Sequence, residues 1–368
     1  MAAPDRPRLT IRAIRATPVL VPMRFALGTS AATVREAPML LVDLETEEGV
    51  TGRAYQFCYR AAAAPAIVTF LDDIVDAVAG EQIVPADIWA RLSKRYTLIG
   101  VQGIVRMAMA MVDVAGWDAL SQAAGVPLAR FLGADPRPVR AYNSNGLGLM
   151  EPAALGDEAL KLLEGGFRAV KLRLGYPTLD ADVKAVRAVR TSVGDGIAVM
   201  VDYNQALTVD EATRRAQALD GEGVYWIEEP IRHDDFTGCA AVAAAAVTPV
   251  QIGENFSQAY DMEKALAARS CDLVMPDLER IGGITGWLRA SALAAAAGMP
   301  MSSHLYPEVS VHLLAATPTA DWLEYVDWVN PLLTEPLSIV DGQAVVPAGS
   351  GTGVAWDPAA AKRYSARF

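Results

Sequence analysis

The sequence predicts an α/β protein in which an N-terminal α+β domain precedes a barrel of alternating strands and helices. Apolar runs that end in an acidic residue recur regularly, since Asp202, Glu228 and Glu254 close three such runs 26 residues apart. That spacing fits one strand plus one helix, and eight such repeats are enough to close a barrel. Upstream, strand-like alternation gives way to helical periodicity, which is typical of a separate α+β domain.

The N-terminal domain is predicted to cover residues 1–135. Three strand-like runs are followed by one long stretch of helical periodicity, in the order 11–21, 39–44, 50–57 and 61–125. Small residues fill the segment 24–34 between the first two strands. We expect this segment to act either as a lid over the barrel or as an ordinary surface loop.

Residues 136–328 are predicted to form the barrel, whose strands run parallel because helical segments separate them. The eight candidate strands are 139–143, 169–174, 197–202, 224–228, 249–254, 273–277, 300–304 and the run that ends at Glu324. Residues 329–368 are rich in Pro and Gly. We expect this last segment to return to the N-terminal domain.

The three acidic residues that close the regularly spaced runs predict a metal site. Parallel strands share one C-terminal edge, so Asp202, Glu228 and Glu254 are expected to converge there. Three carboxylates suit one Mg²⁺ per subunit and leave positions for a bidentate 2-hydroxycarboxylate substrate. Taken singly, each acid has the alternative of being solvated or ion-paired. Glu229 is expected to point to the opposite face of its strand and to stay out of the metal shell.

A histidine and an aspartate also end neighbouring predicted strands. Asp277 is expected to orient His304 as a general base, although such a pair is also a common structural contact. The other two histidines, His233 and His312, are expected to be structural or surface residues.

Two cations, Lys171 and Arg173, lie two residues apart and therefore on the same face of one predicted strand. We expect them at the barrel mouth, where they meet substrate, and outward-facing salt bridges are the alternative. With a divalent ion holding a carboxylate, and Glu324 as a hydrogen-bond donor, these groups predict a reaction that begins by removing an α-proton. A Schiff-base aldolase with Lys171 as nucleophile and a non-catalytic metal-binding scaffold stay open as alternatives.

The composition argues for a globular enzyme without nucleic-acid or membrane partners. The chain has 368 residues, of which 52% are hydrophobic, and a formal net charge of −11. Nucleic acids and anionic membranes both require concentrated positive charge. We expect neither a signal peptide nor a membrane span. The three cysteines are scattered and predict no disulfide framework, so a cytoplasmic location is expected.

Several motifs, in order, resemble the mandelate racemase subgroup of the enolase superfamily. They are Ala169-Val-Lys171, Met200-Val-Asp-Tyr-Asn-Gln205, Trp226-Ile-Glu-Glu-Pro230, Gly253-Glu-Asn255, Ile281-Gly-Gly-Ile-Thr-Gly-Trp287, Met301-Ser-Ser-His-Leu305 and Ala315-Ala-Thr-Pro-Thr319. The resemblance runs nearly end to end and implies a modified TIM barrel, (β/α)7β, with a capping domain that the C-terminal tail completes. It also implies homo-oligomers, often octamers.

The resemblance assigns roles to the candidate residues as well. It implies magnesium on the three regularly spaced acids, a base formed by His304 with Asp277, and Glu324 as electrophile. Asn204 is implied to lie behind the metal ligands or beside the substrate.

One position departs from the family pattern. Racemases of the family carry Lys-x-Lys on this strand, whereas this chain has Lys171-Leu172-Arg173. Freeing an arginine proton near pH 7 costs about 7 kcal/mol, so Arg173 is a poor base. A single base suffices for dehydration, because His304 can remove the α-proton and then protonate a departing β-hydroxyl. The sequence therefore favours dehydration of a hydroxylated sugar acid to a 2-keto acid, with racemisation of an aryl 2-hydroxy acid as the alternative.

The expected substrate pocket is mixed in character. By resemblance, Phe57, Tyr59 and Val34 form an apolar wall that suits an aryl ring, and Gly146 replaces a serine near the substrate. Arg24 is expected either to meet distal hydroxyls or a second carboxylate of the substrate, or to lie exposed in solvent.

Overall fold

The computed structural model describes residues 7–29 and 32–368. Its strands are β1 (Ile11–Gly28), β2 (Thr33–Thr46), β3 (Thr51–Phe57), β4 (Val139–Asn143), β5 (Ala169–Arg173), β6 (Ala198–Asp202), β7 (Val224–Glu228), β8 (Val250–Ile252), β9 (Leu273–Val274), β10 (Leu323–Tyr325), β11 (Ile339–Val340) and β12 (Gln343–Ala344). Its helices are α1 (Ala63–Val78), α2 (Pro85–Arg95), α3 (Gly103–Ala123), α4 (Leu128–Phe131), α5 (Pro152–Leu162), α6 (Leu179–Val193), α7 (Val209–Leu219), α8 (Phe236–Ala245), α9 (Ala259–Ala268), α10 (Leu278–Ile281), α11 (Gly283–Ala297), α12 (Pro307–Ala315), α13 (Pro358–Arg363) and the 3₁₀ helix η1 (Asn330–Leu332).

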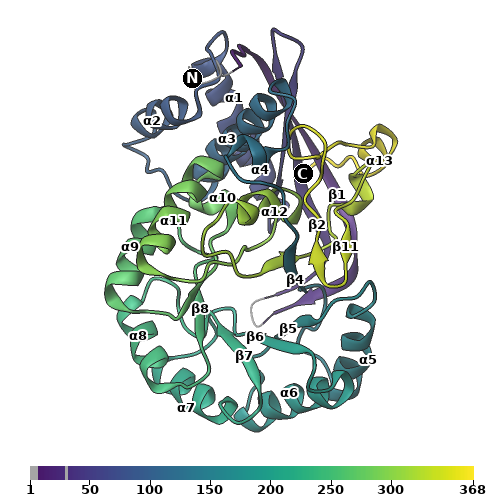
Figure 1. Cartoon of the computed structure of the whole chain (residues 1–368), viewed down its shortest axis with the longest axis vertical. Coiled ribbons are helices and arrows are strands. Elements are labelled where there is room, and N and C mark those ends of the chain that lie inside the picture. The colour runs from purple at the N-terminus through teal and green to yellow at the C-terminus, as the bar shows by residue number, and fades with distance from the viewer. Residues whose placement is uncertain (1–6, 30–31) are drawn as a thin grey trace.

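The N-terminal part forms a cap, in which β1, β2 and β3 pair as one antiparallel sheet. Figure 1 shows this cap and its helices above the ring of barrel helices. The long helix α3 lies so close to β3 that a Cβ at Gly52 would stand 1.9 Å from the carbonyl oxygen of Ala115. Only glycine allows this approach, which buries the apolar side of α3 against the sheet.

The barrel is built from parallel strands, as the alternation of strands and helices predicts. Strands β4 to β9 pair in chain order, and β10 pairs with β4 in parallel. The helices that separate the strands lie outside them, around the lower part of the molecule (Figure 1). The fold is thus an α/β fold in which a capping sheet precedes a mostly parallel, barrel-like sheet.

The predicted strand 300–304 is the main difference from the sequence-based expectation. This segment makes only isolated bridges, from Met301 to Val274 and Ala320, and from His304 to Asp277. Pro276 and Pro300 lack the N–H that a continuous ladder needs, which accounts for the interruption. His304 still lies beside Asp277, because the bridges keep the two segments parallel.

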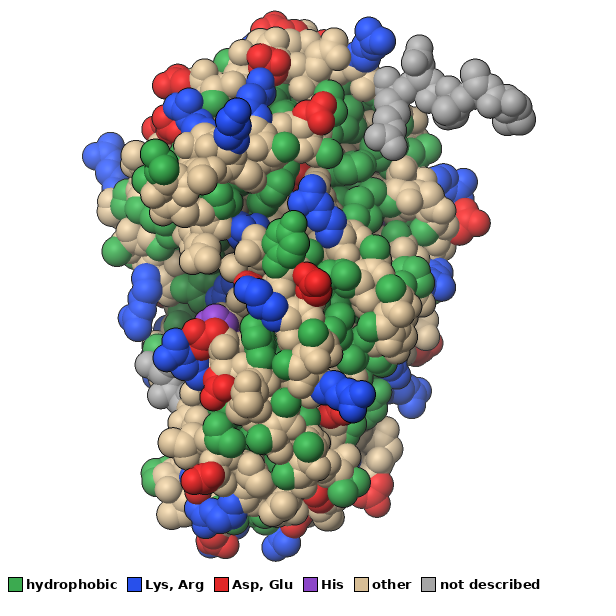
Figure 2. All heavy atoms as spheres, turned by 90° about the vertical axis from the view of Figure 1, so that its left-hand side faces the viewer, with side chains coloured by type: hydrophobic (Ala, Val, Ile, Leu, Met, Phe, Trp, Pro, Cys, Tyr) green, Lys and Arg blue, Asp and Glu red, His purple; other side chains and the backbone are tan. Residues whose placement is uncertain are grey.

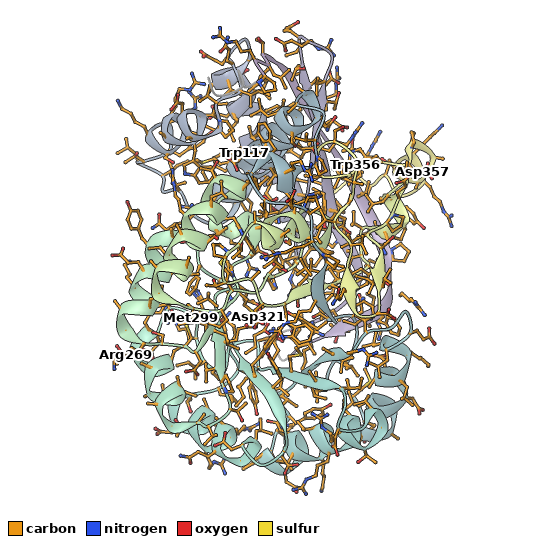
Figure 3. All side chains as sticks on the ribbon, viewed as in Figure 1. Trp117, Arg269, Met299, Asp321, Trp356 and Asp357 are labelled. Atoms are coloured by element: carbon orange, nitrogen blue, oxygen red, sulfur yellow. The ribbon has the colours of Figure 1, made fainter. Side chains whose placement is uncertain are left out.

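The C-terminal segment contacts the barrel first and the cap afterwards. Strand β12 pairs antiparallel with β4 of the barrel. Further on, the N–H of Thr352 donates to Asp118 in α3 at 2.7 Å, and the indole of Trp356 donates to Asp43 in β2 at 3.1 Å. Figure 3 places Trp356 beside the strands of the cap. The segment therefore links the two parts of the molecule.

A buried polar contact joins the cap directly to the barrel. Asp113 of α3 accepts hydrogen bonds from the N–H and the hydroxyl of Thr285 in α11, at 2.8 and 2.5 Å. The indole of Trp117, labelled in Figure 3, donates to the same hydroxyl at 3.0 Å. Burial raises the pKa of Asp113 to about 7, although the hydrogen bonds from Thr285 oppose the shift.

The surface carries charges of both signs. On the face in Figure 2, Lys and Arg side chains are interspersed with Asp and Glu rather than gathered in one patch. Within residues 7–29 and 32–368, no helix is both long and apolar enough to cross a membrane. The cysteines Cys58, Cys239 and Cys271 are buried and unpaired by disulfides.

Candidate active site

The three acidic residues predicted to converge do meet at the C-terminal edge of the barrel strands. Asp202 and Glu228 end the paired strands β6 and β7 and lie opposite each other in the register. Glu254 follows the end of β8 by two residues. One carboxylate oxygen from each residue lies within 4.8 Å of the others. This group of buried oxygens confirms the predicted magnesium ligands.

The three carboxylates are held by neighbouring donors. Asp202 accepts from the backbone N–H of Asn204 at 2.8 Å and from its amide group at 3.1 Å. Glu228 accepts from the indole of Trp226 at 3.1 Å. Hard, preoriented oxygen ligands are what Mg²⁺ requires, and they leave positions for substrate, so the residues present fit this cofactor.

Glu229 stays outside the metal cluster, but it does not point away from it as strand alternation predicts. Its carboxylate accepts from the N–H of Gly253 at 3.2 Å and from the amide of Asn255 at 3.3 Å, on either side of Glu254. Strand β7 ends at Glu228, and Glu229 has a φ of 39°, so the alternation no longer applies. Burial, followed by the charge of Glu254, raises the pKa of Glu229 to about 8.

Lys171 lies inside the barrel mouth, 1% exposed, and not in an outward salt bridge. Its Nζ lies 2.5 Å from Glu228, 2.8 Å from Glu324 and 3.4 Å from Asp202. Burial alone lowers the pKa of Lys171, but these carboxylates outweigh it and raise the pKa above its ordinary value. A protonated ammonium is no nucleophile, which argues against the Schiff-base alternative.

Arg173 is also buried, and both of its terminal nitrogens donate to acceptors, whereas its Nε has no hydrogen-bond partner within the described residues. Nη1 donates to the carbonyl oxygens of Ser144 at 2.7 Å and Gly146 at 3.0 Å. Nη2 donates to the hydroxyl of Ser144 at 2.9 Å. Carbonyl groups can only accept, so they hold Arg173 as a charged donor.

Glu324 accepts hydrogen bonds in this structure, which differs from the donor expected from the sequence. Oε1 accepts from the hydroxyl of Ser144 at 2.6 Å and lies near Lys171, while Oε2 accepts from the N–H of Leu305 at 2.8 Å. Burial raises the pKa of Glu324, but Lys171 and His304 outweigh it and lower the pKa below its ordinary range. A donor role for Glu324 stays a prediction that requires protonation.

His304 and Asp277 form the expected contact. Nδ1 of His304 lies 2.7 Å from Oδ2 of Asp277. In the neutral ring this carboxylate holds the proton on Nδ1, so the lone pair is on Nε2. Nε2 lies 3.3 Å from Glu254 and 3.9 Å from Glu324. Burial alone lowers the pKa of His304, but Glu254, Glu324 and Asp277 together raise it above the ordinary value.

The other two histidines lie apart from this group. His312 is buried in α12, where Nδ1 accepts from the N–H of Ala129 and Nε2 contacts the carbonyl oxygen of Thr352. His233 is half-buried after the end of β7.

A cavity of about 300 Å³ opens over the metal ligands and His304. Among the predicted substrate contacts, Val34, Phe57, Tyr59 and Asn204 line it. Leu27, Thr29 and Ala32 of the 24–34 segment line it as well, and residues 30–31 lie outside the described part of the chain. The expectation of a loop over 24–34 is wrong for most of this segment, because β1 extends to Gly28 and β2 begins at Thr33, and the two strands pair there. A lid role for the segment stays a prediction.

Two of the predicted substrate contacts lie elsewhere. Arg24 is largely exposed, contacts Glu164 at 3.5 Å, and is absent from the cavity lining. Gly146 also lies off the cavity lining, and a Cβ on it would stand 2.2 Å from Oε1 of Glu158. The φ of 57° at Gly146, together with the lack of space beside Glu158, thus favours glycine here.

The cavity contains two cations that the sequence reasoning missed, Arg60 and Arg280. Arg280 lies in the short helix α10, which begins directly after Asp277. The spacing Asp277-Leu-Glu-Arg280 could have predicted this position of Arg280. In a helix that begins at the end of a strand, residues three apart lie on the same face, so Arg280 lies at the same barrel edge as Asp277.

Two family models together match most of the chain. Residues 11–133 match the N-terminal domain of the mandelate racemase/muconate lactonizing enzyme family. Residues 154–360 match the family described as enolase C-terminal domain-like.

Two curated relatives resemble the chain over most of its length. It is 33% identical to the L-talarate/galactarate dehydratase of Salmonella typhimurium over 323 residues, which is 86% of this chain and 80% of the relative. It is 34% identical to the 3,6-anhydro-alpha-L-galactonate cycloisomerase of Streptomyces coelicolor over 343 residues, which is 92% of this chain and 94% of the relative.

Solved structures agree with the fold. An enolase from alpha pretobacterium bal199 with bound magnesium superposes with a TM-score of 0.95 at 43% identity, covering 97% of this chain and 100% of the other. An enolase from Bradyrhizobium complexed with magnesium and mandelic acid gives a TM-score of 0.93 at 38% identity, covering 98% and 99%.

Proposed function

Because the chain belongs to the mandelate racemase/muconate lactonizing enzyme family of the enolase superfamily, we propose that it dehydrates a hydroxylated sugar acid to a 2-keto acid with His304 as its single base. The superfamily chemistry begins with removal of a proton α to a carboxylate, and the magnesium triad for it is in place.

The state of Arg173 carries the proposal. A racemase needs a proton acceptor on each face of the α-carbon, because it must work from either enantiomer. The guanidinium of Arg173 is bound to two carbonyl oxygens and a hydroxyl, which leaves it charged. His304 is therefore the base of this site, and a one-base reaction fits the arrangement.

The reaction proceeds by two proton transfers through the same ring. Nε2 of His304 takes the α-proton of a 2,3-dihydroxy acid, and an enediolate forms while Asp277 stabilises the imidazolium. His304 then returns the proton to the β-hydroxyl, which leaves as water as the C–O bond breaks. The resulting enol tautomerises to the 2-keto acid.

Other residues of the site stabilise the charge that develops. Bound Mg²⁺ supplies a Lewis acid for the substrate carboxylate. Lys171 and Arg173 contribute positive charge from buried positions, where a charge acts more strongly than at the surface. Lys171 is oriented in advance by Glu228 and Glu324.

The test is incubation of the magnesium enzyme with a library of sugar acids, with semicarbazide to report 2-keto products. We expect a 2-keto product from at least one 2,3-dihydroxy acid. In deuterium oxide, we expect deuterium at the α-carbon of the recovered substrate in one configuration only. Turnover of mandelate together with silence across the library would overturn the proposal.

Racemisation of an aryl 2-hydroxy acid is the second candidate. Phe57, Tyr59 and Trp328 give the cavity an aromatic wall, and the Bradyrhizobium neighbour binds mandelic acid. Polarimetry on each mandelate enantiomer decides between the two. We also expect a homo-oligomer, which light scattering of the purified protein measures.

A further inference from the structure

The cation Arg280 is incompletely paired although it is largely buried. Its side chain is 18% exposed. Nη1 donates to the carbonyl oxygen of Glu254 at 3.0 Å and to the side chain of Asn255 at 2.9 Å. Within the described parts of the chain, Nε and Nη2 make no hydrogen bond. Its Nη1 also lies 3.6 Å from Oε1 of Glu254. Because Arg280 lines the cavity, its remaining donors are available to an acceptor that arrives with a ligand.

The orientation of Arg280 is fixed by an aromatic ring. Its guanidinium carbon lies 4.6 Å from the centroid of the Tyr59 ring. Stacking on an aromatic face holds the guanidinium plane and leaves its edge free for an oxyanion. Both residues line the cavity above the metal ligands.

A second guanidinium follows Tyr59 in the chain. Arg60 lines the same cavity, is exposed, and forms no ion pair within residues 7–29 and 32–368. By contrast, Lys171 forms an ion pair with the metal ligand Glu228, and Arg173 donates to a backbone carbonyl oxygen. The cavity thus has two cations beyond those that the reacting carboxylate requires.

We propose that Arg280, supported by Tyr59, and Arg60 form a second anion subsite, which makes a dicarboxylic sugar acid the substrate class in preference to a monocarboxylic one. The inference rests on the proposed function and narrows it. One substrate carboxylate binds at the metal end, and the other binds the free edge of Arg280 as a charge-assisted pair.

The experiment compares C6 dicarboxylic and C6 monocarboxylic sugar acids of the same configuration on the magnesium enzyme. We expect kcat/KM for the diacid to exceed that for the monoacid by about 30- to 100-fold, mainly through KM, because one charge-assisted hydrogen bond differs. Equal values for the two classes would overturn the subsite and leave dehydration intact.

The variants Arg280→Gln and Arg60→Gln test the residues. We expect each to lower the diacid-to-monoacid ratio at least about 10-fold. Arg187→Gln is the matched control, because Arg187 lies exposed on α6 and pairs with Glu222. That control is expected to keep the wild-type ratio.

A purely structural role for Arg280 predicts a different outcome. Because Arg280 contacts Glu254, a structural defect would weaken magnesium binding and lower both activities equally. Calorimetric titration with magnesium, and then with each acid, separates the cases. Diacid binding that exceeds monoacid binding without turnover would support the subsite and contradict the proposed dehydration. An unchanged ratio in both variants would refute the subsite.

Discussion

At the scale of single residues, the decisive contrast is between Arg173 and His304. The acceptors around Arg173 are carbonyl oxygens and a hydroxyl, which bind a donor and stabilise its charge. The contact of His304 with Asp277 instead leaves a lone pair on Nε2 of the neutral ring. The two side chains therefore take different roles in one site, Arg173 as a donor and His304 as a proton acceptor.

The substitution Arg173→Lys is expected to introduce exchange from the second face of the substrate. A lysine beside Lys171 is desolvated next to another cation, which lowers its pKa toward the range of a general base. Proton NMR in deuterium oxide on both enantiomers of a 2-hydroxy acid measures the exchange. If the variant exchanges only the enantiomer that the wild type exchanges, the role of Arg173 is misassigned.

The substitution His304→Asn is expected to abolish exchange on the face that His304 serves. Loss of a general base lowers the rate by about 10²- to 10⁴-fold, because asparagine cannot accept the proton. The same NMR experiment measures the rate, and calorimetry checks that magnesium still binds. Residual exchange at the wild-type rate would rule out His304 as the base.

At the scale of elements, the strand ends carry the site, and Asp277 shows how closely fold and chemistry are linked. Its Oδ1 accepts from the N–H groups of Glu279 and Arg280, both at 2.9 Å, and so caps α10. Its Oδ2 contacts His304. One carboxylate therefore starts a helix and orients the base.

These two tasks can be separated by comparing Asp277→Asn with Asp277→Ala. Asparagine also caps helices, so we expect it to keep the stability, whereas alanine loses about 1 kcal/mol of unfolding free energy. Both are expected to lower kcat by about 10²- to 10⁴-fold. The asparagine amide can donate to Nδ1 and force the proton onto Nε2, and alanine has no group that orients the ring. Urea unfolding and kcat are the measurements. Full activity in Asp277→Asn would contradict the orienting role.

The strand-end pattern explains how much could be predicted from the sequence. Carboxylates at a repeat of one strand plus one helix had to meet at one edge, so Asp202, Glu228 and Glu254 could be found. The interruption of the predicted strand 300–304 could not be predicted, because its isolated bridges depend on neighbours far apart in sequence. Arg280 was missed for a different reason: its signal is local, because it reaches the cavity through α10, which begins directly after Asp277.

At the scale of the whole molecule, metal binding and folding are linked. The carboxylates of Asp202, Glu228 and Glu254 are buried close together, and a ligand that binds only the folded state stabilises it. At 100 times its dissociation constant, Mg²⁺ is expected to add about 2.7 kcal/mol to the unfolding free energy. Thermal or urea unfolding with and without EDTA measures the gain.

A charge-neutral variant provides the control for this linkage. Asp202→Asn is expected to remove most of the gain, and sodium chloride at equal ionic strength should not reproduce it. An equal magnesium effect in Asp202→Asn would place the ion elsewhere.

The junction of cap, barrel and tail contains His312, which predicts a pH dependence of stability. His312 lies in α12, accepts from the N–H of Ala129 in α4 of the N-terminal domain, and contacts Thr352 of the C-terminal segment. Burial lowers its pKa to about 4. The unfolded chain takes up this proton below about pH 6.5 and the folded chain does not, so stability falls as the pH drops from about 6.5 to about 4.

The substitution His312→Gln isolates this contribution, because glutamine can accept from Ala129 and donate to Thr352 without titrating. Between pH 8 and pH 5 the wild type is expected to lose about 2 kcal/mol more unfolding free energy than the variant. Asp113 and Glu308, whose pKa values burial raises to about 7, act in the opposite direction but are common to both proteins and cancel in the difference. Urea unfolding at the two pH values measures it, and parallel profiles would show that His312 does not hold this junction in its neutral form.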